Sequence, residues 1–434
     1  MKKKNSKAKA WIVDVNMGYG HQRTSYPLRS LAPQEKVIHA NDYDGIPNKD
    51  KLTWELGRKG YEFISKFKRL PLIGDPAFKL FDNFQKILDF YPKRDLSKPN
   101  IQLKQELKRI KMGCGKDLIE RLGKDPLPFV TSFFTPAYMA EAFNYPNDIY
   151  SVICDADISR TWASLNPSQS RIKYFTPNTW TTNRLKLYGI KEENIFLTGY
   201  PLPLENIGTS KLEILKKDLK ERLFHLDPKK SYFQKYKVLI EEHLGTLPKT
   251  SKRPLTIMFA VGGAGAQKEI GIKIAGSLKQ LIKEKKIKLI LVAGIREEVK
   301  KYFLERITYL GLKGYLGDSL EIVFAPKIED YFDKFNLALR KTDILWTKPS
   351  ELSFYAGLGL PIIIAPIIGS QESFNRKWLL TLGSGVLQEN PVYTHEWLFD
   401  FLDSGRLAEA AMQGFIEAEK LGTLNIQKII AENY

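Results

Sequence analysis

The sequence predicts an α/β protein with two doubly wound parallel sheets. Short apolar runs alternate with helical patterns along most of the 434 residues, and each half opens with a strand that leads into a glycine-rich turn. The clearest stretch is 343–375, where an apolar run ending at Trp346, a polar turn, a short helix, a second buried strand and another polar loop follow in order. Strand, loop and helix repeated in this way form one turn of a doubly wound sheet. We expect two Rossmann-like domains that face each other across a cleft.

The apolar runs locate the expected strands. In the first half they fall at 11–15, 37–40, 127–133, 149–154, 172–175 and 195–197. In the second half they fall at 255–261, 287–293, 320–324, 343–346 and 361–365. The highly charged stretch between the halves closes on two prolines, which predicts a helical connector. The expected division is therefore a first domain over 1–205, a connector over 206–253 and a second domain over 254–434.

Composition limits the class of protein. A hydrophobic content of 43% is ample for packed cores, and no apolar run is long enough to cross a bilayer. The basic amino-terminus does not read as a signal peptide, because Asp14 and Asn16 interrupt the apolar stretch behind it. Cys114 and Cys154 match neither a metal site nor a disulfide framework, which suits a reducing compartment. We expect a cytoplasmic protein.

The net charge of +18, from 67 Lys and Arg against 49 Asp and Glu, suggests nucleic acid, anionic lipid or simple solubility. The chain shows no zinc-finger spacing, RNP signature or arginine-rich tract, so we expect no nucleic-acid partner. A lysine-rich proteome would account for part of the excess. The distribution of charge is more informative than its total.

Residues 51–123 interleave aromatic and basic residues at helical spacing. The candidate apolar-face residues are Phe63, Phe67, Leu80, Phe81, Phe84 and Phe90. The accompanying charges are Lys66, Lys68, Arg69, Lys79 and Lys86. Such a segment can lie in the headgroup layer of an anionic membrane. It can equally form a helical cap whose aromatic side chains pack on the first sheet, and both interpretations remain open.

Polar loops at the carboxyl ends of strands are the natural ligand sites of such sheets, because helix amino-termini point their free amides there. Glycine, lysine, carboxylate and amide groups recur in three loops of the second half: Gly262, Gly263, Gly265 and Gln267; Lys348, Ser350 and Glu351; Gln371 and Glu372. Glycines let phosphates approach the backbone, although a tight turn also needs small residues. A phosphate-bearing ligand is the expected occupant.

In the first half, the first strand leads into Gly18, Tyr19 and Gly20, with His21 at the start of a helix. The turn lacks the full dinucleotide spacing. A lone histidine is often a helix-capping or core residue, but its place at the carboxyl end of a strand favours a functional role. We take His21 as a candidate catalytic residue.

Several stretches, in order, resemble glycosyltransferase family 28, a GT-B group that includes monogalactosyldiacylglycerol synthase, bacterial diacylglycerol glucosyltransferases and the peptidoglycan lipid-intermediate N-acetylglucosaminyltransferase. In the first half they are GYGH at 18–21, VICDADISRTW at 152–162 and NTWTTNRLKLYGIKEENIFLTGYP at 178–201. In the second half they are AVGGAGAQ, AGIRE, VFAPKIEDYF, TKPSELS and GSQESFN. Cys154 replaces the family's threonine, whereas Asp155 is kept. The resemblance covers most of the chain apart from the connector.

The resemblance implies an inverting transfer of a hexosyl unit from a UDP-sugar to a lipid acceptor such as diacylglycerol at the cytoplasmic membrane surface. It implies that the second domain binds the donor through Gly262, Gly263, Gly265, Gln267, Arg296, Ala325, Lys327, Ile328, Lys348, Ser350, Glu351, Gln371 and Glu372. The acceptor is expected beside Gly18, Tyr19 and Gly20, with His21 as the first choice of general base and Asp155 as the second.

One departure from the family pattern concerns the donor ribose. The family shows Lys-Pro-Gly-Gly and then Ser-Glu, whose carboxylate holds the ribose. Here Ser350 and Glu351 follow Lys348 and Pro349 at once, and no glutamate stands at the later place. Either Glu351 or Glu372 is then expected to hold the ribose.

Two alternatives concern the chemistry. Asp155 and Asp157 form an Asp-x-Asp pattern that can hold a divalent metal in glycosyltransferases of another fold. That fold has one sheet domain and would leave the second glycine loop without a role, so we expect no metal cofactor. A nucleotide-sugar 2-epimerase or a non-catalytic GT-B binding protein would share the fold, although five histidines are few for an epimerase. The sugar and the acceptor are not specified by the sequence.

Overall fold

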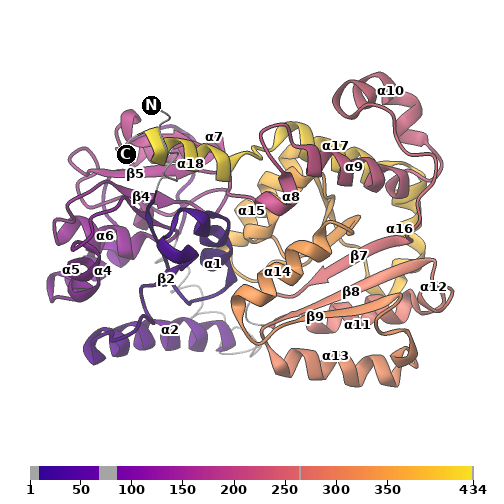
Figure 1. Cartoon of the computed structure of the whole chain (residues 1–434), viewed down its shortest axis with the longest axis horizontal. Coiled ribbons are helices and arrows are strands. Elements are labelled where there is room, and N and C mark those ends of the chain that lie inside the picture. The colour runs from indigo at the N-terminus through magenta and orange to yellow at the C-terminus, as the bar shows by residue number, and fades with distance from the viewer. Residues whose placement is uncertain (1–8, 68–85, 263–264, 433–434) are drawn as a thin grey trace, which may run out of the picture. The chain divides into compact units, whose positions relative to one another are not determined.

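The structure, a computed structural model, describes residues 9–67, 86–262 and 265–432, and it divides the chain into two compact units (Figure 1). Unit 1 comprises Met1–Pro201 and Leu421–Tyr434, and unit 2 comprises Leu202–Lys420. Each unit is built on its own six-stranded sheet in which every strand pairing is parallel. The predicted α/β class, with two Rossmann-like parallel sheets, is confirmed.

The sheet of unit 1 has the strand order β2-β1-β3-β4-β5-β6. Its strands are β1 (Trp11–Asp14), β2 (Ile38–His39), β3 (Phe129–Thr131), β4 (Ile149–Val152), β5 (Ile172–Thr176) and β6 (Ile195–Leu197). Its helices are α1 (Tyr19–Ser25), η1 (Tyr26–Leu31), η2 (Pro33–Glu35), α2 (Asn48–Phe67), α4 (Ile101–Lys111), α5 (Lys116–Leu122), α6 (Phe134–Ala142), η3 (Arg160–Trp162), α7 (Thr179–Leu187), η4 (Glu192–Asn194) and α18 (Gly422–Glu432). The order is flavodoxin-like, so the strand order reverses between β1 and β3.

The carboxyl-terminal helix α18 packs into the core of unit 1. Ile426 and Ile430 are spaced four residues apart, which places them on one helical face, and both are buried in the cluster that contains Leu28 and Val130. Asn425 Nδ2 donates a hydrogen bond of 2.8 Å to the carbonyl oxygen of Thr198. The sequence-based division placed 421–434 with the second domain, whereas these contacts group it with unit 1.

The sheet of unit 2 has the order β12-β11-β10-β7-β8-β9. Its strands are β7 (Leu255–Ala260), β8 (Ile287–Gly294), β9 (Leu320–Phe324), β10 (Ile344–Thr347), β11 (Ile362–Ile364) and β12 (Gly385–Leu387). Its helices are α8 (Leu204–Ile207), α9 (Glu213–Leu226), α10 (Ser231–Leu244), α11 (Lys268–Ser277), α12 (Lys279–Lys283), α13 (Glu297–Tyr309), η5 (Lys313–Tyr315), α14 (Ile328–Leu339), η6 (Glu351–Leu358), α15 (Ser370–Leu382), η7 (Pro391–Tyr393), α16 (Thr394–Asp403) and α17 (Arg406–Glu417).

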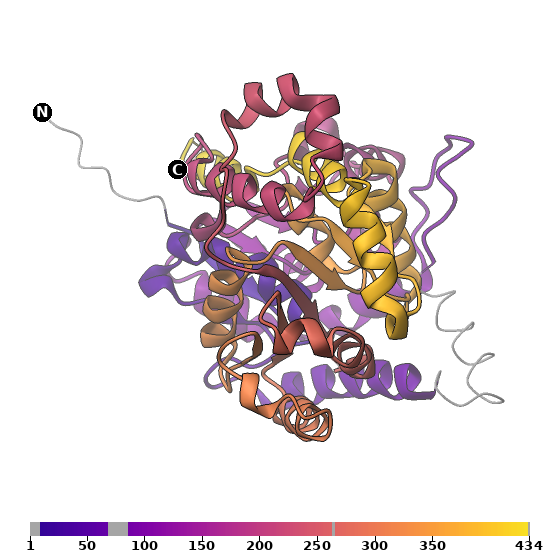
Figure 2. The same cartoon turned by 90° about the vertical axis from the view of Figure 1, so that its right-hand side faces the viewer.

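Read from the other edge, this order is that of the dinucleotide-binding Rossmann sheet, with its reversal between β7 and β10. Right-handed crossovers then place α11 and α13 on one face of the sheet and α14 and α15 on the other, an arrangement that can be followed in Figures 1 and 2. With helices on both faces, all six residues of β7 are buried. No helix in the described part of the chain has the length and apolar character that crossing a bilayer requires.

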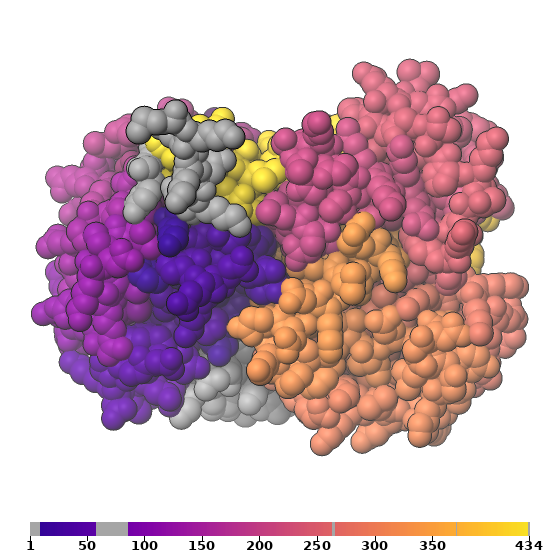
Figure 3. All heavy atoms as spheres, viewed as in Figure 1, coloured from indigo at the N-terminus to yellow at the C-terminus, as the bar shows by residue number. Residues whose placement is uncertain are grey.

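The residues expected to form a connector are helical but are part of unit 2. Helices α8, α9 and α10 cover 204–244, and α9 and α10 form part of the surface of unit 2 seen in Figure 3. Leu219 and Leu223 of α9 are buried. The sequence predicted a separate connector because many charged residues of α9 lie on its solvated face, while its other face packs in unit 2.

A buried guanidinium on α9 forms hydrogen bonds with other parts of unit 2. Arg222 donates to the carbonyl oxygens of Thr342, Leu358 and Leu339 at 2.7, 2.6 and 3.1 Å. Burial lowers the pKa of Arg222 to about 10, so the group stays charged at neutral pH. Three carbonyl oxygens at the ends of α14 and η6 are satisfied by this one side chain.

We predict that Arg222→Met destabilises unit 2 by about 3 kcal/mol or more, because buried carbonyl oxygens lose a charged donor without gaining another. The measurement is the free energy of unfolding from hydrogen exchange of the β7 amides. Lys217→Met, an exposed change on the same helix, serves as the control. Equal stability of the two variants would contradict the role assigned to Arg222.

Candidate functional site

Two candidate sites lie at the carboxyl edges of the two sheets, each at the point where the strand order reverses. In unit 2 the loops after β7 and β10 flank this point, and the loop after β11 is the next along. Neighbouring strands are about 4.8 Å apart, so the ends of these three strands lie within about 10 Å. Sheets of this kind bind ligands in this position.

The loop after β7 is a tight glycine turn. The amide of Gly265 donates to the carbonyl oxygen of Gly262 at 2.8 Å, and Gly265 has φ +66°. A Cβ atom on Gly262 would collide with Cε of Lys348, and one on Gly265 would lie 2.9 Å from Cγ2 of Val299. The positive φ of Gly265 favours glycine there, and the absence of a side chain at Gly262 makes room for Lys348. Gly263 lies outside the described residues.

Lys348 and Glu372 form an ion pair at this edge. Nζ of Lys348 contacts Oε1 of Glu372, and the other carboxylate oxygen accepts a 2.7 Å hydrogen bond from the amide of Ile368. The two charged side chains are only 22% and 12% exposed. Glu372 is the third residue of α15, where a carboxylate also interacts favourably with the helix dipole. The lysine is thereby held over the glycine turn.

The three loops are tied to one another by further hydrogen bonds. Gln267 Nε2 donates to the carbonyl oxygen of Pro366 at 2.7 Å, which links the glycine turn to the loop after β11. Asn375 Nδ2 donates to the carbonyl oxygen of Pro349 at 3.4 Å. The sequence did not single out Asn375, because its function depends on a backbone group 26 residues away.

Ser350, Glu351 and Gln371 have different environments. The hydroxyl of Ser350 caps the amino-terminus of η6 by accepting from the amide of Leu352 at 3.5 Å. Glu351 is buried at 8% exposure within η6, whereas Gln371 is half-buried at the start of α15. Of the two glutamates considered for the ribose, Glu372 is the one that contacts Lys348.

The other expected donor-side residues follow β8 and β9. Arg296 precedes α13, and its Cδ would lie 3.3 Å from a Cβ on Gly265, so the structure brings Arg296 to the glycine turn. Ala325 is buried, while Lys327 is exposed immediately before α14, which begins at Ile328. These last three residues follow β9, two strands from β7.

In unit 1, His21 lies at the reversal between β1 and β3. Its Nδ1 is 2.8 Å from the carbonyl oxygen of Ser132, the residue after β3. Because a carbonyl oxygen can only accept, Nδ1 carries the proton and Nε2 of the neutral ring holds the lone pair. Sγ of Cys154 lies 3.6 Å from Nδ1, and the rings of His21 and Phe133 are 4.6 Å apart. Nε2 is therefore the ring nitrogen that can accept a proton.

Ser132 is a residue that sequence reasoning missed. Its hydroxyl is buried, and no described group forms a hydrogen bond with it. A buried hydroxyl of this kind beside His21 is a candidate ligand contact. The preceding turn supports the arrangement, since Gly18 has φ +126°, while Tyr19 is buried and Gly20 is half-buried at the start of α1.

The two aspartates after β4 differ in role. Asp157 is 2% exposed and accepts from Arg184 Nε and Nη2 at 2.8 Å each and from Trp180 Nε1 at 2.7 Å. Its oxygens are therefore occupied by a structural network. Asp155 directly follows Cys154, the neighbour of His21. Across the described ranges, no three His, Cys, Asp or Glu side chains come together as a metal site.

The aromatic and basic segment is described only in part. Leu80, Phe81, Phe84, Lys68, Arg69 and Lys79 lie outside the described residues, while Phe63, Lys66 and Phe67 lie on α2. Phe90, expected on an apolar face, is buried with its ring 4.2 Å from that of Trp180, so it belongs to the core of unit 1. Lys86 is exposed.

Comparison with known proteins finds one domain family that matches part of the chain. Residues 247–425 match a domain of unknown function, DUF6938. No curated protein matches the chain.

Similar solved structures include MurG from Acinetobacter baumannii, with 12% identity over 98% of this chain and 99% of that one and a TM-score of 0.47. They also include a UDP-GlcNAc 2-epimerase from Neisseria meningitidis bound to UDP-GlcNAc, with 14% identity, 98% and 99% coverage and a TM-score of 0.46. A glycosyltransferase from Rickettsia africae has 14% identity, 98% and 100% coverage and a TM-score of 0.41. Similarity at this level assigns no activity to the chain.

The edge of unit 2 is predicted to bind pyrophosphate through Lys348. Lys348→Met should weaken pyrophosphate binding, measured by calorimetry, about 10- to 100-fold, because a charge-assisted contact is lost. Lys341→Met, an exposed change in the same unit, should leave binding unchanged.

The double variant Lys348→Met with Glu372→Gln separates two causes of that loss. If Lys348 contacts the phosphate, the double variant binds as weakly as the single one. Full recovery in the double variant would show that the single change acts only by leaving Glu372 unpaired, and would contradict the assignment.

Proposed function

We propose that the protein is an inverting glycosyltransferase that resembles family 28 and transfers a hexosyl unit from a UDP-sugar to a lipid acceptor. The observation that carries the proposal is the edge of unit 2, where a glycine turn, the Lys348–Glu372 pair and the amino-terminus of α15 meet at the strand-order reversal. A diphosphate needs close backbone approach and positive charge, and this edge provides both.

On this proposal the diphosphate of the donor lies over Gly262 and Gly265, with Lys348 and Arg296 beside it. An ammonium has three N–H groups, so Lys348 can bind Glu372 and a phosphate oxygen together. Gln371 and Glu372 then hold ribose or sugar hydroxyls, and Glu372 is preferred over Glu351 because it lies beside Lys348. The base of the nucleotide extends toward Ala325, Lys327 and Ile328.

The acceptor hydroxyl is assigned to the edge of unit 1. His21 takes its proton through Nε2, since the carbonyl oxygen of Ser132 fixes the proton on Nδ1. The imidazolium formed in this step keeps that hydrogen bond. Asp155 is the second choice of base. Charge on the leaving diphosphate is balanced by side chains and helix amino-termini, so the reaction needs no bound metal.

The proposal also places the protein at the inner face of the cytoplasmic membrane. Two leucines of α2, Leu52 and Leu56, are 60% and 70% exposed and lie one turn apart. Exposed leucines on a helix at the start of the basic and aromatic segment 51–123 support contact with an anionic headgroup layer.

Turnover of UDP-sugars by the purified chain tests the proposal, with diacylglycerol in anionic or neutral vesicles and excess chelator present. We expect a glycolipid product, faster with anionic vesicles. His21→Ala and the closer-sized His21→Gln should lower kcat about 10²–10⁴-fold with UDP binding intact. His395→Ala, a surface change in unit 2, serves as the control.

Each outcome has a distinct meaning. An epimerised UDP-sugar without glycolipid would favour the 2-epimerase alternative, and UDP binding without any product would favour a non-catalytic binding protein. Near-normal turnover in both His21 variants would remove His21 as the base. A rate that ignores anionic lipid would remove the membrane contact.

A further inference from the structure

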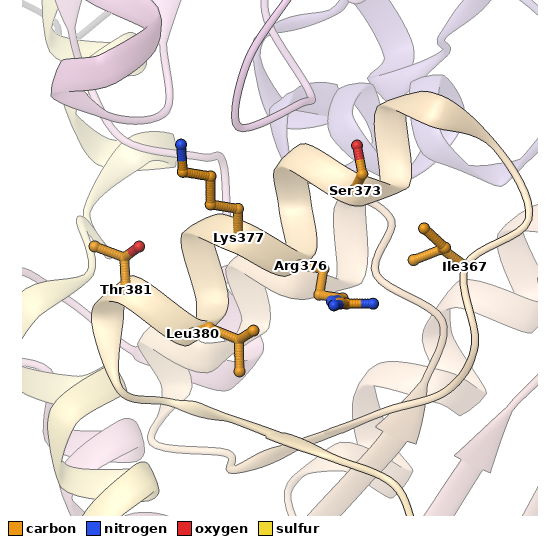
Figure 4. Close-up of a pocket in the computed structure, with 6 residues that line it drawn as sticks. All are labelled: Ile367, Ser373, Arg376, Lys377, Leu380 and Thr381. Carbon is orange, nitrogen blue, oxygen red and sulfur yellow. The ribbon is translucent and has the colours of Figure 1, made fainter.

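A hollow beside α15 is lined by cationic and aliphatic side chains that have no role in the proposed function. It has a volume of about 480 Å³ and is lined by Ile367, Ser373, Arg376, Lys377, Leu380 and Thr381. Figure 4 shows these residues along one length of the helix, with Ile367 on the loop that leads into it. This α15 hollow is within the range of volumes that small-molecule sites occupy.

The helical repeat explains why these side chains gather. Ser373, Arg376, Lys377 and Leu380 have the spacing of one helical face, whereas Glu372, Asn375 and Leu379 lie on the buried face. The buried face packs into unit 2, and the face with Arg376 and Leu380 lines the hollow. It contains two cations and no carboxylate.

Arg376 would ordinarily pair with an acid four residues before it. That residue is Glu372, which instead binds Lys348 and the amide of Ile368. Across the described ranges no other carboxylate lies within ion-pair distance of Arg376. The guanidinium therefore faces the hollow without an anionic partner among the described residues.

Aliphatic side chains flank the guanidinium. Ile367 and Leu380 are 38% and 41% exposed, which is unusual for large aliphatic residues. In Figure 4, Arg376 lies between them, and the three side chains point to the same side of the helix. Lys377, the next residue, adds a second positive charge to the rim.

We propose that the α15 hollow binds a phosphate monoester on an aliphatic chain. The guanidinium fork of Arg376 matches the oxygens of a phosphate monoester, which carries a charge of about −1.5 to −2 at pH 7. Ile367 and Leu380 cover the first carbons of the chain. The same chemistry occurs in a free alkyl phosphate and in the headgroup of a lipid phosphate.

The test is calorimetry with hexyl phosphate and, separately, inorganic phosphate. Arg376→Gln should weaken hexyl phosphate binding at least tenfold. Leu380→Ser should weaken it about threefold to tenfold and leave inorganic phosphate unchanged, because only the chain loses a contact. Lys301→Gln, an exposed cation on α13, is the charge-matched control and should bind hexyl phosphate normally.

A variant of the proposed donor site separates the two sites. The double variant Lys348→Met with Glu372→Gln should bind hexyl phosphate as the unaltered chain does, so that failure of the donor assignment would not affect this result. Vesicles containing phosphatidate distinguish the sources of the ligand. Loss of vesicle binding in Arg376→Gln, with competition by hexyl phosphate, identifies a lipid headgroup, and Arg376-dependent binding of hexyl phosphate alone identifies a free ester.

The proposal is overturned if hexyl phosphate does not bind, or if Arg376→Gln and Lys301→Gln bind it equally well. It is also overturned if the double variant Lys348→Met with Glu372→Gln abolishes binding, because the ester would then occupy the edge of the sheet rather than the α15 hollow.

Discussion

Parallel strands place all the strand-to-helix loops of a unit at one edge of its sheet, and the reversal of strand order opens a gap between two of those loops. Both units of this chain obey this constraint. In unit 2 the reversal lies between β7 and β10, and in unit 1 it lies between β1 and β3. The residues with the clearest chemistry are Lys348, in the loop after β10, and His21, in the first turn of the helix that follows β1. The strand order alone determines where these residues lie, without reference to side-chain geometry.

The balance of charge at the edge of unit 2 sets what can bind there. A lysine buried beside a glycine turn is costly unless an anion compensates it. Glu372 supplies that anion and is itself held by the amide of Ile368. Since Glu372 is used in this way, Arg376 one turn later has no acid to pair with on α15. The carboxylate of Glu372 therefore compensates the positive charge at the proposed donor site and leaves that of Arg376 in the α15 hollow uncompensated.

Much of the fold could be predicted from the sequence because local patterns determine it. The apolar runs at 255–261, 287–293 and 320–324 correspond to β7, β8 and β9 within one residue. The short strand β12 (Gly385–Leu387) was not expected, since it contains only two apolar residues, Val386 and Leu387, after a glycine. The loops that bear Gly262, Lys348 and Glu372 were also identified, because parallel sheets send their loops to one edge.

Long-range contacts could not be predicted in this way. The pairing of His21 with Ser132 joins residues 111 positions apart, and Arg222 bonds backbone groups 117 to 136 positions away. In the sequence, such an arginine cannot be distinguished from a charged residue on the exposed face of a helix. Phe90 shows the same limit, because an amphipathic pattern does not distinguish a face on lipid from a face on Trp180.

The central claim is that a nucleotide diphosphate binds at the strand-order reversal of unit 2. Hydrogen–deuterium exchange with and without UDP tests it most directly. The account predicts slower exchange at 265–268, 348–352 and 368–373, with no change at the outer face of α13. Unchanged exchange in all three loops, or protection confined to other parts of the chain, would contradict it.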